Sequence, residues 1–274
     1  MADGGGVALA GPSMVFLSVG GRRLEVAWHG PGPDAAPTLV FLHEGLGCVG
    51  MWKEFPRRLA EATGCGALVY SRAGYGCSDP CDLPRPLHYM QDEGLHTLPQ
   101  VLAAAGVRDC VLVGHSDGGS IALVYAGGTE AAPLRGVITE AAHVFCEDLS
   151  VRSIAAAREA YLRGSLREGL ARYHGDNVDC AFWGWNDVWL DPGFRHWNLE
   201  EYLPGVRVPL LALQGKEDEY GTSAQVEAIA GQVGGSAEVV MLSDCGHAPH
   251  RDQPETTLAA MTRFVTAVLG GEGA

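Results

Sequence analysis

Short apolar runs alternate along the chain with longer segments in which apolar residues recur at helical spacing. The apolar runs are continuous and rich in valine and leucine, as is typical of strands covered on both faces, and they occupy residues 38–43, 66–71, 110–115, 136–141, 209–215 and 237–243. Helices are expected between them, at about 51–63, 88–105, 117–127, 222–232 and 254–268. Two runs flanking Gly20-Gly21 predict an N-terminal hairpin. This alternation predicts a mostly parallel α/β sheet of about eight strands flanked by helices.

The alternation stops between Val144 and Val206, where no good strand is found. Residues 151–174 have a helical composition, with basic and acidic side chains three and four positions apart. The next stretch contains four of the six tryptophans of the chain, at Trp183, Trp185, Trp189 and Trp197. We therefore predict a helical insertion over 144–205, on a core domain formed by 1–143 and 206–274.

The charge of the chain narrows the classes of partner. Its formal net charge is −14 and its pI is near 5.0. Nucleic acid is an unfavourable partner because its phosphates would repel such a surface, and anionic lipid is disfavoured for the same reason. No apolar run approaches the roughly 20 residues that cross a bilayer, and the N-terminus carries acid where an export signal carries base. We expect a cytoplasmic protein, a small-molecule substrate, no membrane attachment, and either a monomer or a homodimer.

The eight cysteines are scattered and form no Cys-x-x-Cys motif. In a chain of this size without an export signal, reduced thiols are expected, with a Cys77–Cys81 bridge as the alternative in an oxidising setting. No histidine and cysteine spacing is typical of zinc, so we predict neither a metal nor a cofactor. The glycine-rich N-terminus is expected to be a frayed tail.

The stretch Gly114-His115-Ser116-Asp117-Gly118 matches the G-x-S-x-G pattern. It follows an apolar strand and opens a helix, the context in which a serine occupies a strained turn and becomes a nucleophile. His115 and Asp117 are immediate neighbours of Ser116, so their side chains point away from it. We expect His115 to be a bystander, and Asp117 to contribute its backbone N–H to an oxyanion hole.

The general base and its acid must therefore come from other loops. His247 follows the last predicted strand, and an acidic group formed by Glu217, Asp218 and Glu219 follows the strand before it. The carboxyl ends of parallel strands share one edge of the sheet, where sites of α/β proteins collect. The resulting chain order, serine then acid then histidine, is that of the G-x-S-x-G hydrolases.

With these motifs, the sequence resembles the α/β-hydrolase superfamily from about residue 15 to 268. The resemblance implies Asp218 as the acid, in a Gly-x-x-Asp turn, and His247 rather than His250 as the base. The stretch FLHEGLG at 41–47 is similar to the family's oxyanion loop and implies Gly45 as the second N–H donor. Glu44 stands where the family usually has glycine, which leaves Leu46 as the alternative donor. The resemblance also implies structural roles for His43 and for Arg72.

The resemblance further implies that the insertion forms a cap over the nucleophile. Because FWGWND looks too polar and too interrupted by glycine for a regular core helix, Trp183 and Trp185 are expected to line the pocket. His143 and Phe145, after the sixth strand, are expected to face the site from below the cap. The aromatic content indicates an apolar acyl or ring pocket.

These residues indicate a serine hydrolase, with a small, partly apolar carboxylic ester as the leading substrate. A C–C bond hydrolase of the meta-cleavage-product type, a lactonase and an amidase use the same groups and stay open as alternatives. A more distant alternative is a ligand receptor on the same fold that has no catalytic role.

Overall fold

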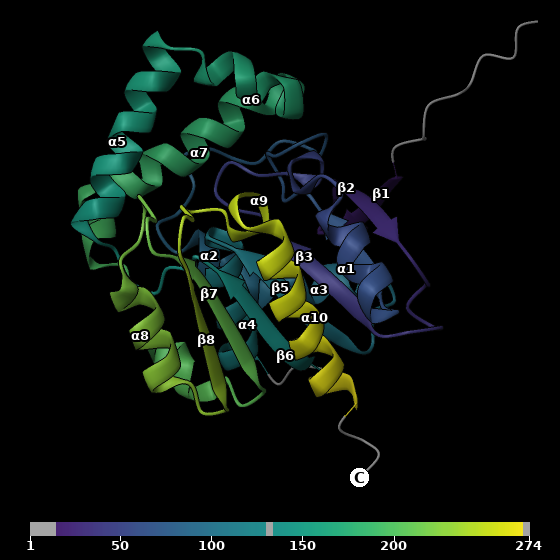
Figure 1. The fold of residues 1–274 in the computed structure, drawn as a ribbon. Coiled ribbons are helices and arrows are strands. Elements are labelled where there is room, and N and C mark those ends of the chain that lie inside the picture. The colour runs from purple at the N-terminus through teal and green to yellow at the C-terminus, as the bar shows by residue number, and fades with distance from the viewer. Residues whose placement is uncertain (1–14, 130–133, 271–274) are drawn as a thin grey trace, which may run out of the picture.

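The computed structural model describes residues 15–129 and 134–270, and its centre is one sheet of eight strands (Figure 1). The strands are β1 (Val15–Val19), β2 (Arg22–His29), β3 (Thr38–Leu42), β4 (Gly66–Tyr70), β5 (Cys110–His115), β6 (Leu134–Glu140), β7 (Leu210–Gly215) and β8 (Ala237–Leu242). Their spatial order is β1-β2-β4-β3-β5-β6-β7-β8. Strand β2 runs antiparallel to β1 and β4, whereas β3 to β8 are parallel. The predicted fold class is therefore confirmed.

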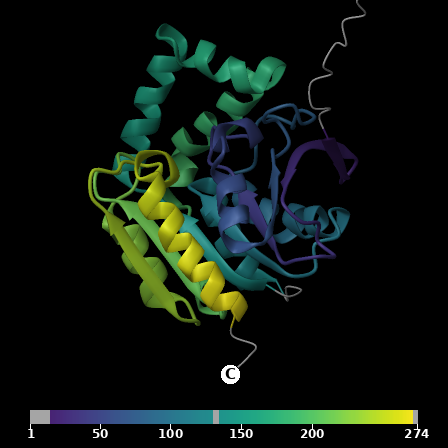
Figure 2. The ribbon, with the colours of Figure 1, turned by 45° about the vertical axis from the view of Figure 1, so that its right-hand side comes forward.

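Helices cover both faces of the sheet, which explains the continuous apolar strands. In β3, Leu39 and Phe41 pack toward α1 (Phe55–Thr63) and α10 (Pro254–Gly270). The alternate residues of the same strand pack into a second apolar layer with α3 (Leu98–Ala104), α4 (Asp117–Gly128) and α8 (Ser223–Gln232). Figure 2 shows α10 lying along one face of the sheet. Every residue of β3 is buried, because successive side chains enter opposite layers.

The helix predicted over 88–105 is divided into three parts. It consists of α2 (Tyr89–Asp92), a π-helical turn (Glu93–Thr97) and α3. Gly94 lies in the π-helical turn, and a Cβ there would come within 2.8 Å of Val124 Cγ1 on α4. The glycine therefore allows this segment to pack closely on α4.

The segment between β6 and β7 is helical, as expected. It contains α5 (Asp148–Arg163), α6 (Leu166–His174) and α7 (Val178–Leu190), and 3-10 turns at Gly175–Asn177, Pro192–His196 and Glu200–Gly205. A further 3-10 turn, Val49–Trp52, lies between β3 and α1. Figure 1 places α5, α6 and α7 together beyond one end of the sheet. The stretch FWGWND was expected not to form a regular core helix, and that expectation is wrong, because it lies within α7. The division into core and cap domains stays a prediction.

The two ends of this inserted segment lie side by side. Phe145 forms an antiparallel bridge with Asn198, and the Leu199 N–H donates to the Val144 carbonyl at 2.7 Å. The outgoing and returning parts of the chain are thus joined by one isolated β-bridge.

None of the helices in the described ranges is long and apolar enough to cross a membrane. The remaining short helix, α9 (Pro249–Asp252), follows β8. The predicted frayed tail lies outside the described residues.

Candidate active site

Ser116 lies in a tight turn between β5 and α4, with φ 52° and ψ −118°. A positive φ is strained for a residue with a side chain, and such strain is common at active sites. Two glycines make the turn sterically feasible: a Cβ on Gly118 would collide with the Leu42 carbonyl, and one on Gly114 with the Gly118 carbonyl. The G-x-S-x-G pattern is therefore a packing requirement of this strand-to-helix turn.

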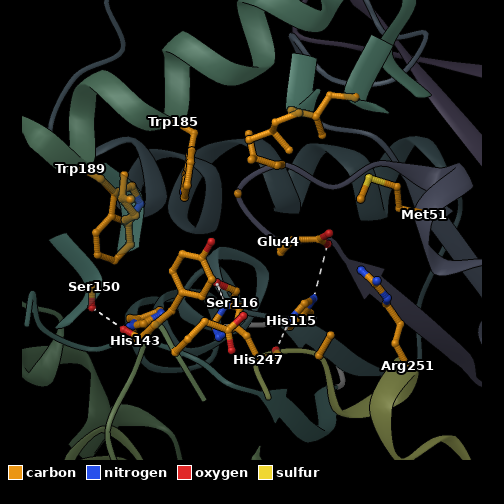
Figure 3. A pocket seen from close by; sticks show the side chains of 18 of the residues that line it. Glu44, Met51, His115, Ser116, His143, Ser150, Trp185, Trp189, His247 and Arg251 are labelled. Carbon is orange, nitrogen blue, oxygen red and sulfur yellow. Dashed lines mark hydrogen bonds and ion pairs between the residues drawn. The ribbon is translucent and has the colours of Figure 1, made fainter. Parts of the chain in front are cut away.

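The turn brings Ser116 to the two residues predicted as its partners. Figure 3 shows His247 beside Ser116, and His247 Nε2 lies 2.9 Å from Ser116 Oγ. On its other side, His247 Nδ1 lies 2.8 Å from Asp218 Oδ1. The three residues follow the carboxyl ends of β5, β7 and β8, which share one edge of the sheet. Because Asp218 can only accept, His247 Nδ1 carries a proton and Nε2 is free to accept the serine proton.

Asp218 is held as a carboxylate. Burial alone would raise its pKa, but the hydrogen bond and charge of His247 and the Tyr220 N–H lower the pKa below its usual value. Oδ1 also accepts from the N–H of Tyr220 at 2.8 Å, and Oδ2 accepts from the Gln214 side chain at 3.0 Å. Glu217 and Glu219, the other acids considered, are not bonded to His247.

The backbone N–H groups of Asp117, of Gly45 and of the adjacent Leu46 have no acceptor among the residues that the structure describes. The Asp117 side chain is fully buried beneath the turn, where the Tyr89 hydroxyl donates to it and Arg72 lies 3.7 Å away. Burial raises the pKa of Asp117, although the charge of Arg72 opposes that rise. The carboxylate thus points away from the site and leaves the N–H available.

Arg72 anchors the loop that carries Gly45. Its guanidinium donates to the carbonyls of His43 at 2.6 Å and Glu44 at 3.1 Å, and its N–H donates to His43 Nε2 at 3.0 Å. His43 therefore donates from Nδ1 to the Glu44 carbonyl, at 2.7 Å. Both side chains are fully buried, so their roles in this loop are structural.

A pocket of about 310 Å³ opens over Ser116 and His247 (Figure 3). One wall comes from the inserted helices and is formed by Ile154, Leu166, Leu170, Trp185 and Trp189. The opposite side includes the loop with Glu44 and Gly45, together with Met51. Among the described residues, no group of three or more histidine, cysteine, aspartate or glutamate side chains could hold a metal ion.

The family follows from a comparison with known families. The model of the alpha/beta hydrolase family matches residues 39–260, which is most of the chain. The chain belongs to this family. No curated protein matches this alpha/beta hydrolase significantly.

Solved structures share its fold at low sequence identity. An esterase from Exiguobacterium antarcticum is 20% identical, with a TM-score of 0.74 and coverage of 92% of this chain and 99% of that one. An enol-lactonase from Burkholderia xenovorans LB400 is 19% identical, with a TM-score of 0.70 and coverage of 92% and 100%. A proline iminopeptidase from Mycobacterium smegmatis is 19% identical, with a TM-score of 0.67 and coverage of 93% and 98%.

Of the four predicted substrate contacts of this alpha/beta hydrolase, His143 and Trp185 line the pocket, whereas Trp183 and Phe145 do not. Residues two apart on a helix face opposite sides, so Trp183 points away from the pocket and packs against Tyr161. Phe145 instead belongs to the bridge that joins the two ends of the inserted segment.

Trp189 is the pocket residue that sequence reasoning missed most clearly. It lies four positions after Trp185, on the same face of α7. Its ring centroid lies 5.2 Å from that of His143. A helical reading of the tryptophan-rich stretch would have found this pair from the spacing alone.

His143 is a neutral imidazole at the pocket floor. Burial, which is the main cause, and the charge of His247 lower its pKa to about 3. Its ring centroid lies 5.7 Å from that of His247, and Nδ1 has no hydrogen-bond partner among the described residues. It can therefore offer a neutral polar contact to a bound molecule beside the reactive groups.

Proposed function

We propose that this alpha/beta hydrolase is a serine hydrolase that cleaves a small, partly apolar carboxylic ester. The observation that carries this proposal is the continuous hydrogen-bond series from Ser116 through His247 to Asp218, with its serine end inside a pocket. A hydroxyl, a base and an orienting carboxylate in that sequence are the requirements for nucleophilic acyl transfer.

In the proposed reaction, Ser116 Oγ attacks the ester carbonyl carbon while His247 Nε2 takes the hydroxyl proton. Asp218 stabilises the imidazolium, and the N–H groups of Asp117 and Gly45 receive the developing oxyanion. The C–O bond then breaks, and the alcohol leaves with the proton from His247. A water molecule, deprotonated by His247, attacks the acyl-enzyme carbon and releases the carboxylic acid, which restores Ser116.

The pocket supports a small and partly apolar substrate. Its volume of about 310 Å³ is at the lower end of the range for small-molecule sites. The wall from the inserted helices is apolar, with Leu166 and Leu170 beside two tryptophans. His143 supplies a neutral polar contact at the floor. We assign the apolar wall to the acyl or alcohol chain, with Trp185 as its central contact.

The direct test is turnover of p-nitrophenyl acetate and butyrate. Ser116→Ala and Asp218→Asn should each lower kcat by about 10⁴-fold or more, since the members of such a triad act as a unit. Asp187→Asn, which removes an exposed carboxylate from α7, is the matched control and should retain activity. Equal activity of Ser116→Ala and the native protein would refute the nucleophile.

A fluorophosphonate probe provides a second readout that does not depend on the natural substrate. It should label Ser116 and leave Ser116→Ala unlabelled; labelling of another residue instead would contradict the assignment. A panel of esters, lactones and ring-fission dienones would then identify the acyl compound with the highest kcat/KM. No turnover of any panel member would favour a ligand receptor.

A further inference from the structure

Glu44 and His115 form a second polar contact in the pocket, next to the proposed triad (Figure 3). His115 Nδ1 lies 3.4 Å from Glu44 Oε2, and His115 Nε2 lies 2.7 Å from the backbone carbonyl oxygen of His247. The imidazole thus spans two loops, one that carries Gly45 and one that carries His247. His115 is only 3% exposed, so solvent competes little for either contact.

The contacts define the protonation state of His115. The His247 carbonyl can only accept, so Nε2 carries a proton. An ionised Glu44 can also only accept, and a bare Nδ1 lone pair facing it would be repelled. With both nitrogens protonated, His115 is an imidazolium paired with a carboxylate. The 3.4 Å contact between Nδ1 and Glu44 is an ion pair and not a hydrogen bond, and the conclusion applies to an ionised Glu44.

We propose that the Glu44–His115 ion pair is a positioning device, which holds the oxyanion loop and the catalytic-histidine loop in register only while His115 is protonated. The proposal rests on the proposed hydrolase function for its kinetic consequence. Neither residue is assigned a direct role in bond cleavage. His115 acts through the His247 backbone, and Glu44 acts through the adjacent Gly45.

The oxyanion loop is shaped to place the Glu44 carboxylate here. A Cβ on Gly47 would collide with Glu44 Oε2, so glycine at that position gives the carboxylate its room. Arg72 holds the Glu44 carbonyl at 3.1 Å from the other side. A bare carboxylate beside an oxyanion hole would oppose the developing negative charge, and the imidazolium of His115 neutralises it.

Other charged and titratable groups also face His115. Glu140, at the end of β6, and His250, on α9, lie behind it and pair with each other at 2.8 Å. The His250 ring centroid lies 5.1 Å from that of His115, and the His247 ring centroid lies 5.3 Å away. His143 is a further titratable neighbour and is neutral. Arg251 and Asp252, on α9, line the same pocket, and Figure 3 shows Arg251 on the side of Glu44 and His115.

These surroundings predict when the device fails. Burial alone would lower the pKa of His115, but the contact with Glu44 and the charges of Glu44 and Glu140 raise it to about 9. Burial disfavours an ionised Glu44, but His115 outweighs this and lowers the pKa of the Glu44 carboxyl. Above the pKa of His115 the pair is broken, and the uncompensated carboxylate faces the oxyanion loop.

The first test is the pH dependence of ester turnover. Native kcat/KM should fall by about 10-fold between pH 8 and pH 10, as expected for one essential protonated group with a pKa of about 9. Glu44→Gln should remove this alkaline decrease, because its amide can donate to a neutral His115 Nδ1 and restore the bridge at every pH. Glu61→Gln, which removes an equal charge from exposed α1, should keep the native profile.

Two further variants separate positioning from folding. Glu44→Ala should lower kcat more than it changes KM, and should lack the alkaline decrease, whereas Glu44→Gln should recover most of the native kcat. A native alkaline decrease in both Glu44 variants would overturn the proposal. Thermal unfolding midpoints near the native value would exclude a general loss of structure as the cause.

The protonation claim has a readout that needs no activity. In ¹⁵N-edited NMR of the full chain carrying Ser116→Ala, both ring nitrogens of His115 should be protonated at pH 7 and should titrate near pH 9. A neutral His115 at pH 7 would overturn this inference and leave the proposed hydrolase function untouched. Failure of ester turnover, with a protonated His115, would instead count against the proposed function.

Discussion

At the scale of single residues, the pocket depends on which face of α7 each tryptophan occupies. The indole of Trp185 packs so closely on Gly45 that a Cβ on this glycine would collide with its Nε1 atom. Trp183 lies on another face, stacked edge-on against Phe182 and beneath the guanidinium of Arg158. Two tryptophans of the same short helix thus have different surroundings.

This difference predicts a selective effect of truncation. Trp185→Ala should lower kcat/KM for p-nitrophenyl acetate by roughly tenfold, because a pocket contact is lost, and should favour longer acyl chains that fill the space. Trp183→Ala removes the same side chain from the same helix and should change kcat/KM less than threefold. An unchanged chain-length preference in Trp185→Ala would contradict the pocket assignment.

At the scale of elements, the buried strands were predictable because parallel strands covered on both faces are continuously apolar. Helix α7 was not predictable in the same way, because Gly184 and the polar residues near it disfavour a helix locally. Tertiary packing explains why glycine occupies position 184, because a Cβ there would come within 2.7 Å of Arg85 Nε. The glycine lets α7 approach the core.

The same distinction holds for the candidate site. The order of Ser116, Asp218 and His247 could be predicted, since loops after parallel strands meet at one sheet edge. The contact between Glu44 and His115 could not be predicted. His115 and Ser116 are neighbours in the sequence, which indicates only that the His115 side chain faces away from Ser116. What lies on that other side depends on the fold of a distant loop.

Helix α7 also brings two thiols together at its start. All eight cysteines are free, and Cys180 Sγ lies 3.3 Å from Cys81 Sγ in the loop after β4. The Cys81 hydrogen bond lowers the pKa of Cys180, which favours the nucleophilic thiolate. The Cys77–Cys81 bridge considered from sequence is not formed.

Treatment with diamide, a two-electron oxidant, should therefore join Cys81 to Cys180. The expected product is one disulfide-linked peptide pair in mass spectrometry, with a raised midpoint of thermal unfolding because α7 is then tied to the core. Cys180→Ser should abolish both changes, and Cys77→Ser should preserve them. A Cys77–Cys81 pair in the oxidised native protein would contradict the predicted linkage.

At the scale of the whole molecule, buried histidines couple folding to pH in opposite directions. Burial lowers the pKa of His43, His143 and His174 in the folded protein, whereas Glu44 and Glu140 raise that of His115 against its burial. An unfolded histidine titrates near pH 6.5. The first three residues therefore stabilise the fold above about pH 6.5 and lose that contribution as the pH falls toward their folded values.

His115 has the opposite dependence. Its contribution is complete below about pH 6.5 and is lost as the pH rises through about 9. Thermal unfolding midpoints measured from pH 4 to pH 10 should thus peak near pH 6.5 to 7. His143→Asn should reduce the slope on the acid side, and His115→Asn should reduce the slope on the alkaline side. Unchanged slopes in both variants would contradict these assignments.

The antiparallel bridge between Phe145 and Asn198 has a consequence for how this protein can change. Because the inserted segment begins and ends at one point, its replacement leaves the spacing of the sheet's loops intact. None of Ser116, Asp218 and His247 lies between the two bridge residues, whereas Trp185 and Trp189 both do. Transplanting the insert of a homologous hydrolase between these two residues should therefore change one wall of the pocket, while Ser116, Asp218 and His247 keep their places.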